Sequence, residues 1–593
     1  MNSWVPPAFI FFAGALLAGV LKGRLRQAAL LMVPVIAFQN LLNMPEGTAY
    51  SVSFLGHSVV LGQVDRLSMV FGYIFVIMGF AGNVFALHLE DTGQHVAAFS
   101  YIGSSLGVVF SGDYISLFVF WEIMALTSAW LIWARRSEAS KAAGLRYFVV
   151  HALGGMLLLC GIVIRVAETG NIAFGHVGLD GLASWLILLG FALNAAVPPL
   201  SAWLSDSYPE ATVTGAVFLS AFTSKTAVYV LARAFPGEEV LIWAGTIMTI
   251  YGIVYAILEN DMRRVLAYSI INQVGFMVAG IGIGTELSLN GSASHAFAHI
   301  LYKALLMMSA GAVLYMTGRS KCTELGGLYR TMPVTLVFCL VGAASISAFP
   351  LTGGFVSKSM IIAAAGEGHM TAIWHLLMLA SAGVFLHAGI KFPWFVFFAK
   401  DSGLRPKEAP LNMLVAMGFL AFLCIFIGVF PESLYRILPY ETGFEPYTAG
   451  HVLGQLQLLL YSALAFFVLL KYLQRTDTIS LDTDWFYRKG AGAFMWLIQG
   501  PGGALGAALR RAAFEALPGA LAWYGRNPVA ALRIAWHFSL SAVSGPERGA
   551  ELRRRAREEL AAYPGDVTWH WAVGTAVIWI TVILLAYLVV YYL

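Results

Sequence analysis

Long apolar stretches constrain this chain more than any other feature of its sequence. We count about sixteen runs of roughly 17–25 mostly apolar residues, the length that an α-helix needs to cross a bilayer. Of the 593 residues, 59% are hydrophobic and only 11% are charged, whereas soluble domains carry about 25% charged residues. The sequence therefore predicts an all-α polytopic membrane protein. The runs begin near residues 7, 28, 67, 95, 114, 146, 183, 211, 239, 264, 293, 333, 372, 411, 455 and 570.

Composition excludes several other classes of protein. The four cysteines are not closely paired, so they give no disulfide or metal signature. The net charge of +4 is too small and too spread along the chain to indicate a nucleic-acid partner. The first apolar run ends in Lys22, Arg24 and Arg26 and a second run follows at once, so no cleavable signal peptide is expected.

Charges in the connecting loops predict the orientation of the runs. If the N-terminus lies outside, the odd-numbered loops are cytoplasmic, and these loops are rich in Lys and Arg, as the positive-inside rule requires. The even-numbered loops carry mostly acids, although the cytoplasmic loops at 89–95 and 204–210 are acidic exceptions. We therefore predict a multi-pass protein of the cell inner membrane with both termini on the outer, periplasmic side.

The segment 486–568 differs from the rest of the chain. Prolines interrupt it, and apolar residues alternate with charges such as those in "ELRRRAREEL". This pattern predicts lateral amphipathic helices on the cytoplasmic surface of the membrane. The alternative is a cytoplasmic linker with no mechanical role. The final run, 570–593, would then return through the bilayer.

Several ionisable side chains fall inside the predicted spans. A charge at mid-bilayer costs about 2.5–3.5 kcal/mol on insertion scales, so each one indicates a function or a buried partner. A lone histidine can instead be a packing residue, and a lone lysine can extend to the interface. This alternative carries most weight for His387 and Lys391, which approach the cytoplasmic end of their span. The residues nearer to mid-span are Glu122, Lys225, His295, His299, Lys303 and Lys358.

Three of these residues form a regular column. His295, His299 and Lys303 are four residues apart, so on a helix they lie along one face. Burial disfavours the charged form of a lysine and a nearby acid favours it, so moving an acid can make a lysine take up or release a proton. Lysines and histidines linked by water can thus relay protons. The alternative, a metal held by the two histidines, lacks a general base between them, and we expect no metal and no redox cofactor.

Two predicted spans contain a break. The stretches "LNAAVPPLSAWLSDS" (193–207) and "ISAFPLTGGFVSKSM" (346–360) both place proline and small residues in mid-span. Proline removes a backbone donor, and inside a membrane such breaks survive only against protein or a wet cavity. Two breaks at matching places indicate a transport site, although each alone is also compatible with an ordinary proline kink.

From about residue 60 to 435 the sequence resembles a known family. The motifs that carry the resemblance are "DYISLFVFWEIMALTSAWLI", "PPLSAWLSDSYPEA", "TSKTAVYVLAR", "ENDMRRVLAYSIINQVGFM", "HAFAHILYKALLMMSAGAV", "ELGGLYRTMP" and "PLTGGFVSKSM". They resemble the antiporter-like, proton-translocating subunits of respiratory complex I, membrane-bound hydrogenases and Mrp-type Na⁺/H⁺ antiporters. "WLSDSYPEA" with "TSKTAVYVLAR" looks most similar to the D-type Mrp component, whereas the tail resembles the long complex I and hydrogenase forms.

The resemblance implies a fold of two inverted five-helix repeats with broken seventh and twelfth spans. The implied segments are 1–94 (spans 1–3), 95–234 (first repeat), 239–400 (second repeat), 411–475 (spans 14 and 15), 486–568 and 570–593. It also implies that Glu122 is the acid that modulates a lysine, that Lys225 links two half-channels, and that Lys358 lies where protons leave or enter. His295, His299 and Lys303 would form the central hydrophilic axis.

The sequence departs from the family at two positions. The lysine usual in the broken seventh span is Asn194 here, and an amide holds water but takes up no proton at neutral pH. Either Glu122 acts on Lys225 instead, which we favour, or the first half-channel works differently or is idle. The acid that often follows the lysine of span 12 is Ser359.

Three functional hypotheses follow. The first is a subunit that translocates protons, with sodium as another candidate, within a multi-subunit Mrp-like, hydrogenase-like or complex I-like membrane assembly. The second is a subunit that supplies proton flux to an inorganic-carbon uptake complex. The third is a structural membrane subunit with a degenerate channel, for which Asn194 is the only support. No catalytic site is expected in this chain.

Overall fold

The computed structural model describes residues 4–54, 56–476, 482–565 and 573–592. The chain divides into two compact units, Met1–Asp484 and Trp485–Leu593. In the described part of the first unit most residues are helical, which confirms the predicted all-α membrane architecture. The predicted runs coincide with helices, except that the predicted start near residue 570 lies outside the described residues.

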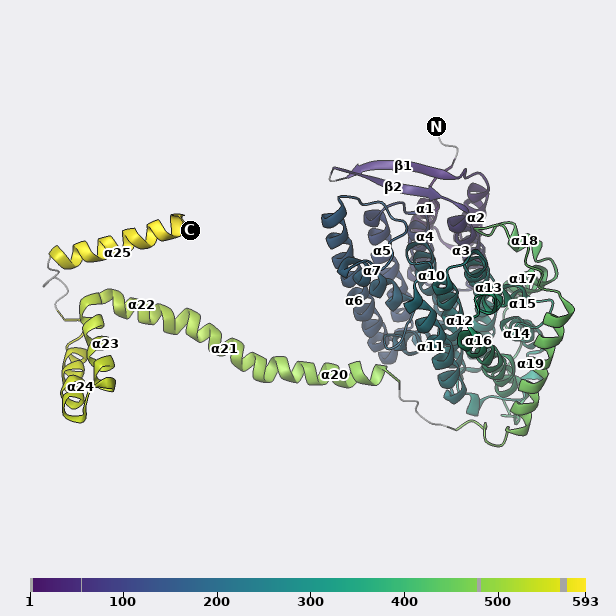
Figure 1. Ribbon diagram of the computed structural model, residues 1–593. Helices are drawn as coiled ribbons and strands as arrows, with labels where there is room; N and C mark the ends of the chain where they lie inside the picture. Colours follow the sequence, from purple (N-terminus) through teal and green to yellow (C-terminus); the bar gives the residue numbers. More distant parts are fainter. Residues whose placement is uncertain (1–3, 55, 477–481, 566–572, 593) are drawn as a thin grey trace. The chain divides into compact units, whose positions relative to one another are not determined.

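Three helices and a β-hairpin come first along the chain (Figure 1). They are α1 (Pro7–Val20), α2 (Gly23–Leu42), β1 (Gly47–Phe54), β2 (His57–Val64) and α3 (Arg66–Phe85). The antiparallel β1–β2 hairpin was not expected from the sequence. Its β2 strand lies against the start of a later helix, since the amide of Val60 donates to Asp113 Oδ2 (2.7 Å).

The remaining helices of the first unit fall into three groups along the chain. The first group is α4 (Thr92–Phe110), α5 (Tyr114–Trp133), α6 (Glu138–Thr169), α7 (Leu182–Asn194), α8 (Ala202–Ser207), α9 (Val213–Leu219) and α10 (Thr223–Ala234). The second is α11 (Glu239–Leu258), α12 (Met262–Ile283), α13 (Glu286–Thr317), α14 (Pro333–Ile346), α15 (Gly353–Glu367), α16 (Thr371–Val384) and the π-helical turns η4 (Phe385–Lys391) and η5 (Trp394–Phe398). The third is α17 (Leu411–Val429), α18 (Glu432–Tyr435) and α19 (Ala449–Val468).

Length and composition identify which helices suit a bilayer. Among the described residues, twelve helices are long and apolar enough to cross a membrane, and α1, α7 and α14 are shorter apolar helices. The total number of crossings stays a prediction. The most apolar stretch of α12 is entirely buried and that of α13 is 94% buried, against 22% for α19. The helix with the predicted column therefore lies at the centre of the bundle, shielded from lipid.

The first and second groups share details of sequence and geometry. Helices α6 and α13 both have 32 residues. Each begins after a hydroxyl cap, Ser137 or Thr285, which accepts from the third amide of the helix, and each ends at a glycine with φ of 68°, Gly170 or Gly318. Positive φ is inexpensive only for glycine, which explains this helix end. In Figure 1 α5–α7 lie on one side of the bundle and α13–α17 on the other.

Both breaks predicted from sequence are present and have the same backbone geometry. Ala196 after α7 and Ala348 after α14 have φ of 61° and 56°. The next amide bonds back over five residues in each case, from Val197 to Ala192 O (3.1 Å) and from Phe349 to Ala344 O (3.0 Å). Proline follows directly at both breaks, so neither helix can continue.

The chain after α19 returns to the first unit at Asp482. This buried carboxylate accepts from Tyr268 Oη (2.6 Å), from Tyr251 Oη and from Ser205 Oγ (3.3 Å). Ser205 belongs to the first group of helices and both tyrosines belong to the second. Asp482 thus joins the two groups at one point.

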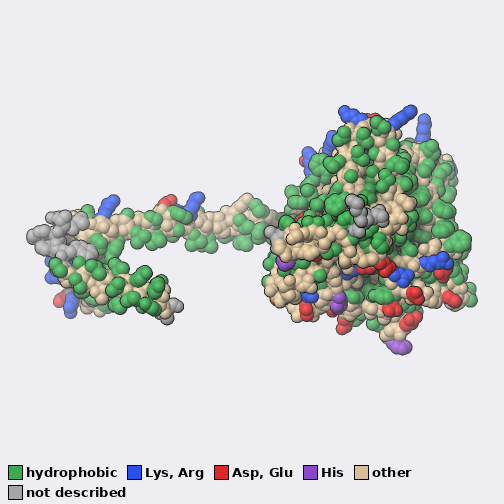
Figure 2. Space-filling view, turned by 90° about the horizontal axis from the view of Figure 1, so that it is seen from above, with side chains coloured by type: hydrophobic (Ala, Val, Ile, Leu, Met, Phe, Trp, Pro, Cys, Tyr) green, Lys and Arg blue, Asp and Glu red, His purple; other side chains and the backbone are tan. Residues whose placement is uncertain are grey.

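The second unit is helical in its described residues. Its elements are α20 (Asp484–Leu497), η6 (Ile498–Gly502), α21 (Gly503–Arg511), η7 (Ala512–Ala516), α22 (Leu517–Arg526), α23 (Pro528–Val543), α24 (Pro546–Ala561) and α25 (Val573–Tyr592). Figure 2 shows charged side chains along one edge of the α20–α22 segment and hydrophobic ones along the opposite edge. Helix α25 is apolar on all sides, whereas the described helices of the predicted segment 486–568, α20–α24, are amphipathic as predicted. Their placement along a membrane surface stays a prediction, and residues 566–568 of that segment lie outside the described part.

Candidate functional site

The column predicted on α13 lies in the interior of the bundle. His295, His299 and Lys303 are all completely buried. They follow one another at intervals of one helical turn, and the ring centroids of the two histidines are 6.3 Å apart. Three ionisable side chains therefore share one inward-facing side of α13.

Lys303 is held by α12. Its Nζ donates to Ser269 Oγ (2.8 Å) and lies 3.5 Å from the carbonyl oxygen of Leu266. Among the described residues, no carboxylate lies within ion-pair distance of Lys303. A buried amine with polar but uncharged neighbours is suited to gaining and losing a proton, because neither form is fixed by a salt bridge.

The two histidines differ in their contacts. His295 Nδ1 hydrogen-bonds Ser357 Oγ of α15 (3.1 Å), and its Nε2 is 3.5 Å from Tyr302 Oη. Neither ring nitrogen of His299 has a partner among the described residues. Since buried polar groups are nearly always hydrogen-bonded, these nitrogens call for water.

Lys358 lies on α15, just after the second break. Its Nζ donates to the carbonyl of Ile346, the last residue of α14 (3.1 Å), and lies 5.3 Å from the ring centre of Phe276. The free carbonyls and negative dipole end of an interrupted helix attract a cation, which explains this placement.

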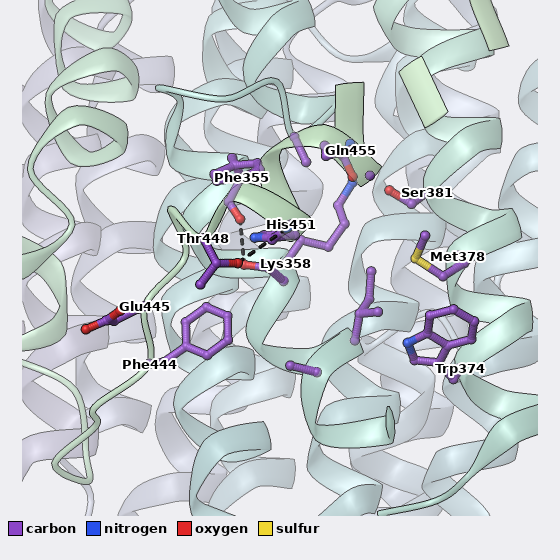
Figure 3. Close-up of a pocket in the computed structure, with 16 residues that line it drawn as sticks. Phe355, Lys358, Trp374, Met378, Ser381, Phe444, Glu445, Thr448, His451 and Gln455 are labelled. Carbon is purple, nitrogen blue, oxygen red and sulfur yellow. Dashed lines mark hydrogen bonds between the residues drawn. The ribbon is translucent and has the colours of Figure 1, made fainter. Parts of the chain in front are cut away.

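A cavity of about 400 Å³ adjoins Lys358 (Figure 3). It lies between α15, α16, α19 and the segment before α19, and its polar lining includes His451, Gln455 and Ser359. His451 stacks on Phe355 with a centroid separation of 4.4 Å. The sequence prediction did not include His451 or Gln455, because they come from a helix outside the two predicted repeats.

Lys225 lies in the first turn of α10, just after the short break that follows α9. Its Nζ donates to the carbonyl of Ser220 (2.6 Å) and to Ser224 Oγ (3.1 Å). It also lies close enough to interact electrostatically with His299 and Lys303. Lys225 thus lies within electrostatic range of the α13 column, and its role as a link between two half-channels stays a prediction.

Glu122 lies on α5 and faces α6. A Cβ added at Gly155 would overlap its Oε1, and that oxygen has no hydrogen-bond partner among the described residues. No ion pair or hydrogen bond joins Glu122 to Lys225 in the described part of the chain. From the sequence we favour a direct action of Glu122 on Lys225. No contact between the described residues supports it, so it stays a prediction.

Asn194 is the last residue of α7, at the first break. It is completely buried, and both polar atoms of its side chain lack a partner among the described residues. A Cβ added at Gly154 would lie 3.6 Å from Asn194 Oδ1. Asn194 and Glu122 thus approach consecutive glycines of α6.

His387 and Lys391 lie in the π-helical turn η4. His387 Nδ1 hydrogen-bonds the carbonyl of Gly383 (2.7 Å). Lys391 Nζ donates to three carbonyls at the C-terminal end of α11, those of Ala256 (2.6 Å), Ile257 (2.9 Å) and Glu259 (2.7 Å). These bonds favour a structural role for Lys391, because the last carbonyls of a helix have no partner within the helix and a lysine can satisfy them.

The sequence prediction did not include a buried histidine of α6. His151 of α6 is only 1% exposed and lies one turn before Gly154 and Gly155. The available signal was a histidine followed by two glycines in the middle of an apolar run, "HALGGMLLL". A single histidine of this kind is usually a packing residue, which is why the pattern alone did not single it out.

Comparisons with known proteins agree with the fold. Residues 111–385 match the family model described as NADH:quinone oxidoreductase/Mrp antiporter, TM. The chain is 29% identical to a Rhizobium meliloti protein, the A/B component of a probable K⁺/H⁺ antiporter, over 63% of this chain and 40% of that protein. It is 26% identical to hydrogenase-4 component B of Escherichia coli, over 62% of each chain. The chain thus matches less than two thirds of the length of these two relatives.

Solved structures extend the likeness in fold. A chain of the archaeal membrane-bound sulfane sulfur reductase complex matches 98% of this chain and 99% of its own length, with a TM-score of 0.68 and 22% identity. These findings confirm the resemblance seen in the sequence and a multi-pass membrane protein. The prediction that the D-type Mrp component is the most similar branch stays a prediction.

Proposed function

We propose, from the match of residues 111–385 to the NADH:quinone oxidoreductase/Mrp antiporter membrane family model, that the protein is an ion-translocating subunit of a multi-subunit membrane complex. The cargo is the proton, with sodium as the other candidate. The partners are further membrane subunits of an antiporter-like, hydrogenase-like or complex I-like assembly. The relatives named above, one from a probable antiporter and one from a hydrogenase, support this class of partner.

The observation that carries the proposal is the alignment of buried ionisable groups through the centre of the bundle. Lys225, the α13 column and Lys358 are all buried, and they lie close enough to one another to interact electrostatically. His299 has unpaired nitrogens, and the other groups bond only to neutral partners among the described residues. Such a set can pass a proton through intervening water, because each group can both accept and donate at the same atom.

The cavity beside Lys358 supplies the outer end of the proposed route. It is lined by residues 355–363 of α15, by Trp374, Met378 and Ser381 of α16 and by the start of α19. With the orientation predicted from loop charges, the loop that joins α15 to α16 and the segment before α19 lie on the outer side of the cell inner membrane, and both termini lie on that side as well. Protons would therefore leave or enter through this cavity.

The proposed domain plan follows the predicted segments. Spans 4–8 (95–234) and 9–13 (239–400) form two inverted repeats, and the shared caps of α6 and α13 and the matching breaks support this plan. The helices of 486–568 lie along the cytoplasmic surface. A degenerate channel remains a second candidate, because Asn194 replaces an ionisable group in the first repeat.

Flux measurements test the proposal. The complete complex is reconstituted into vesicles, and proton and sodium movements are followed with Lys225→Ala and Lys303→Ala. Each variant should lose flux, because each removes a titratable group that no neighbour replaces. Lys141→Ala is the matched control, since the side chain of Lys141 is 59% exposed. Wild-type flux in both interior variants would exclude the route.

A further inference from the structure

His151 on α6 is a buried histidine with a defined hydrogen-bonding state. Its Nδ1 is 2.9 Å from the carbonyl oxygen of Tyr147. A carbonyl only accepts, so Nδ1 carries the hydrogen and Nε2 presents a lone pair. Nε2 has no partner among the described residues. The hydrogen bond to the backbone therefore fixes the ring, and Nε2 remains as an unpaired proton acceptor in the interior of the bundle.

Other unpaired polar atoms approach the same face of α6 as Nε2 of His151. Residues 151, 154 and 155 lie one turn apart on the buried side of the helix. Gly154 faces the unpaired side chain of Asn194, and Gly155 faces the unpaired Oε1 of Glu122. Because Gly155 lacks a side chain, the carboxylate of Glu122 fits against α6 at this point, and the unpaired polar atoms call for water.

Aromatic rings cover the other sides of His151. The ring of Tyr147 stacks on it at 3.9 Å and the ring of Trp203 meets it edge-on at 4.5 Å. Trp203 is itself fixed, since its Nε1 donates to the carbonyl of Leu193 at the end of α7 (3.0 Å). His151 thus lies directly at the first break.

Few charged or titratable groups come from the elements packed on α6. Helix α5 contributes Glu122 and also Tyr114, which interacts with Arg165 of α6, whereas α7 contributes no charged or titratable group. Helix α8 contributes Asp206, which is paired with Arg146, and the following turn contributes Tyr208 and Glu210, the latter near the surface with Arg135. Of these, Glu122 is the acid without an ion-pair partner among the described residues, so it is the natural exchange partner for His151.

The shared capping of α6 and α13 gives His151 a counterpart. His151 follows the cap Ser137 by 14 residues, and His299 follows the cap Thr285 by 14 residues. By the same count Gly155 corresponds to Lys303, each 18 residues after its cap. In α13 the lysine stands on the helix itself, whereas at α6 the carboxylate of Glu122 reaches over the glycine.

A chain of hydroxyls leads from His151 toward Lys225. Tyr147 Oη donates to Ser128 Oγ (2.8 Å) and is 3.5 Å from Thr223 Oγ1. Thr223 begins α10 and also hydrogen-bonds Tyr101 Oη (2.6 Å). Lys225 follows two residues later, so the phenol that stacks on His151 is tied to the start of the lysine's helix.

We propose that His151 is the proton carrier of the first repeat, in place of the amine that Asn194 cannot supply. Nε2 takes a proton from the Glu122 side through water and becomes an imidazolium with Nδ1 still bonded to the Tyr147 carbonyl. The same Nε2–H bond then breaks as the proton moves on toward Thr223 and Lys225. Only a proton is transferred, so no other reactant is needed. This inference rests on the proposed translocation function.

The test uses His151→Gln in the complete complex in vesicles. Glutamine keeps a polar side chain but cannot take up a proton, so proton flux should fall by about 100-fold or more, the scale of a lost positioned acid–base group. His375→Gln is the matched control, because His375 makes the same bond to the carbonyl four residues back (2.7 Å) but is exposed. Asn194→Lys added to His151→Gln should restore part of the flux.

The outcomes separate this inference from the proposed function. Wild-type flux in assembled His151→Gln complexes, while Lys303→Ala loses flux, would overturn the role of His151 alone. Absence of flux in the unmodified complex would overturn the proposed function. If His151→Gln does not assemble, Tyr147→Phe decides. It keeps the backbone carbonyl that binds His151 and removes the hydroxyl bond to Ser128, so reduced flux supports the relay and unchanged flux rejects it.

Discussion

The two groups of helices that we propose as repeats use corresponding backbone positions for different purposes. Asp206 and Lys358 each lie ten residues after the alanine of positive φ that marks their break. Asp206 accepts two hydrogen bonds from Arg146, at 2.7 and 2.9 Å, whereas Lys358 bonds one carbonyl and adjoins a cavity. In the first group of helices, Asp206 forms a salt bridge at this position and stabilises the break. In the second group, Lys358 at the same position has no salt bridge among the described residues and can gain or lose a proton.

This difference shows how two helix groups with similar breaks can serve structure in one case and proton binding in the other. An ion pair lowers the free energy of one protonation state of both partners, so it stabilises structure and resists titration. A lysine with only neutral partners has no such preference. We therefore expect substitutions at the two positions to affect different measurable quantities, and the following predictions are ordered by the size of the expected effect.

The largest effect is expected at Lys358. Lys358→Met keeps the length of the side chain and removes the titratable amine, so flux in vesicles should fall to that of vesicles without the complex. The thermal unfolding midpoint should change little, because the amine makes a single hydrogen bond within the described part of the chain, to the carbonyl of Ile346. Flux close to the wild-type value would show that the cavity beside Lys358 is not part of the route.

Asp206 should give the opposite pattern. Asp206→Asn removes the carboxylate charge beside Arg146 and should destabilise the fold by about 2–3 kcal/mol, less than the roughly 3–5 kcal/mol of fully buried pairs because Arg146 is 27% exposed. A lower unfolding midpoint with normal flux per assembled complex is the expected result. Loss of flux without loss of stability would contradict the assignment of a structural role.

The sequence predicted much of this comparison but not its details. Apolar runs located the helices, and the prolines at 198 and 350 located both breaks, because each signal is local in the chain. The column on α13 was also local, since a four-residue spacing determines one face of a helix. These features need no knowledge of which helices become neighbours.

Other features could not be read from local signals. Residues 47–64 were passed over because they lack a long apolar run, yet their alternating side chains and the Gly56 turn form a hairpin. His451 lies far from Lys358 in sequence, and only packing of α19 brings it to the same cavity. The role open to His151 depends on Gly154, Gly155 and residues of two other helices, so it required the tertiary structure.

A smaller effect is expected from the glycine pair on α6. Gly155→Ala would place a Cβ on Glu122 Oε1, and the flexible carboxylate would move away, so flux should fall several-fold. Stability should change by only about 1 kcal/mol, because alanine also favours the helix over glycine. Gly154→Ala is the matched control, as its Cβ would meet Leu193 Cδ2 at 3.2 Å and Asn194 Oδ1 at 3.6 Å. Equal flux in both variants would show that transport does not depend on the position of the Glu122 carboxylate.

The smallest effect is expected at Asp401, an ion-paired aspartate outside the helices that contrasts with Asp206. The bonds from Arg405 and from the amide of Gly403 hold the pKa of Asp401 well below its usual range. A lowered pKa contributes stability above the pKa of the unfolded chain, and this contribution disappears as the pH falls through the folded value. Because the pair is exposed, water and salt screen it at neutral pH.

Asp401→Asn should therefore lower the unfolding midpoint only slightly at pH 7, less at high salt, and not at all once the pH lies below the pKa of both states. Measuring the midpoint of the wild type and of Asp401→Asn across this range checks the sign. If Asp401→Asn were as harmful as Asp206→Asn, or if its effect persisted in acid, burial would not be what separates the two aspartates. The comparison between Asp206 and Lys358 would then depend only on whether each residue titrates, and not on the burial of the salt bridge.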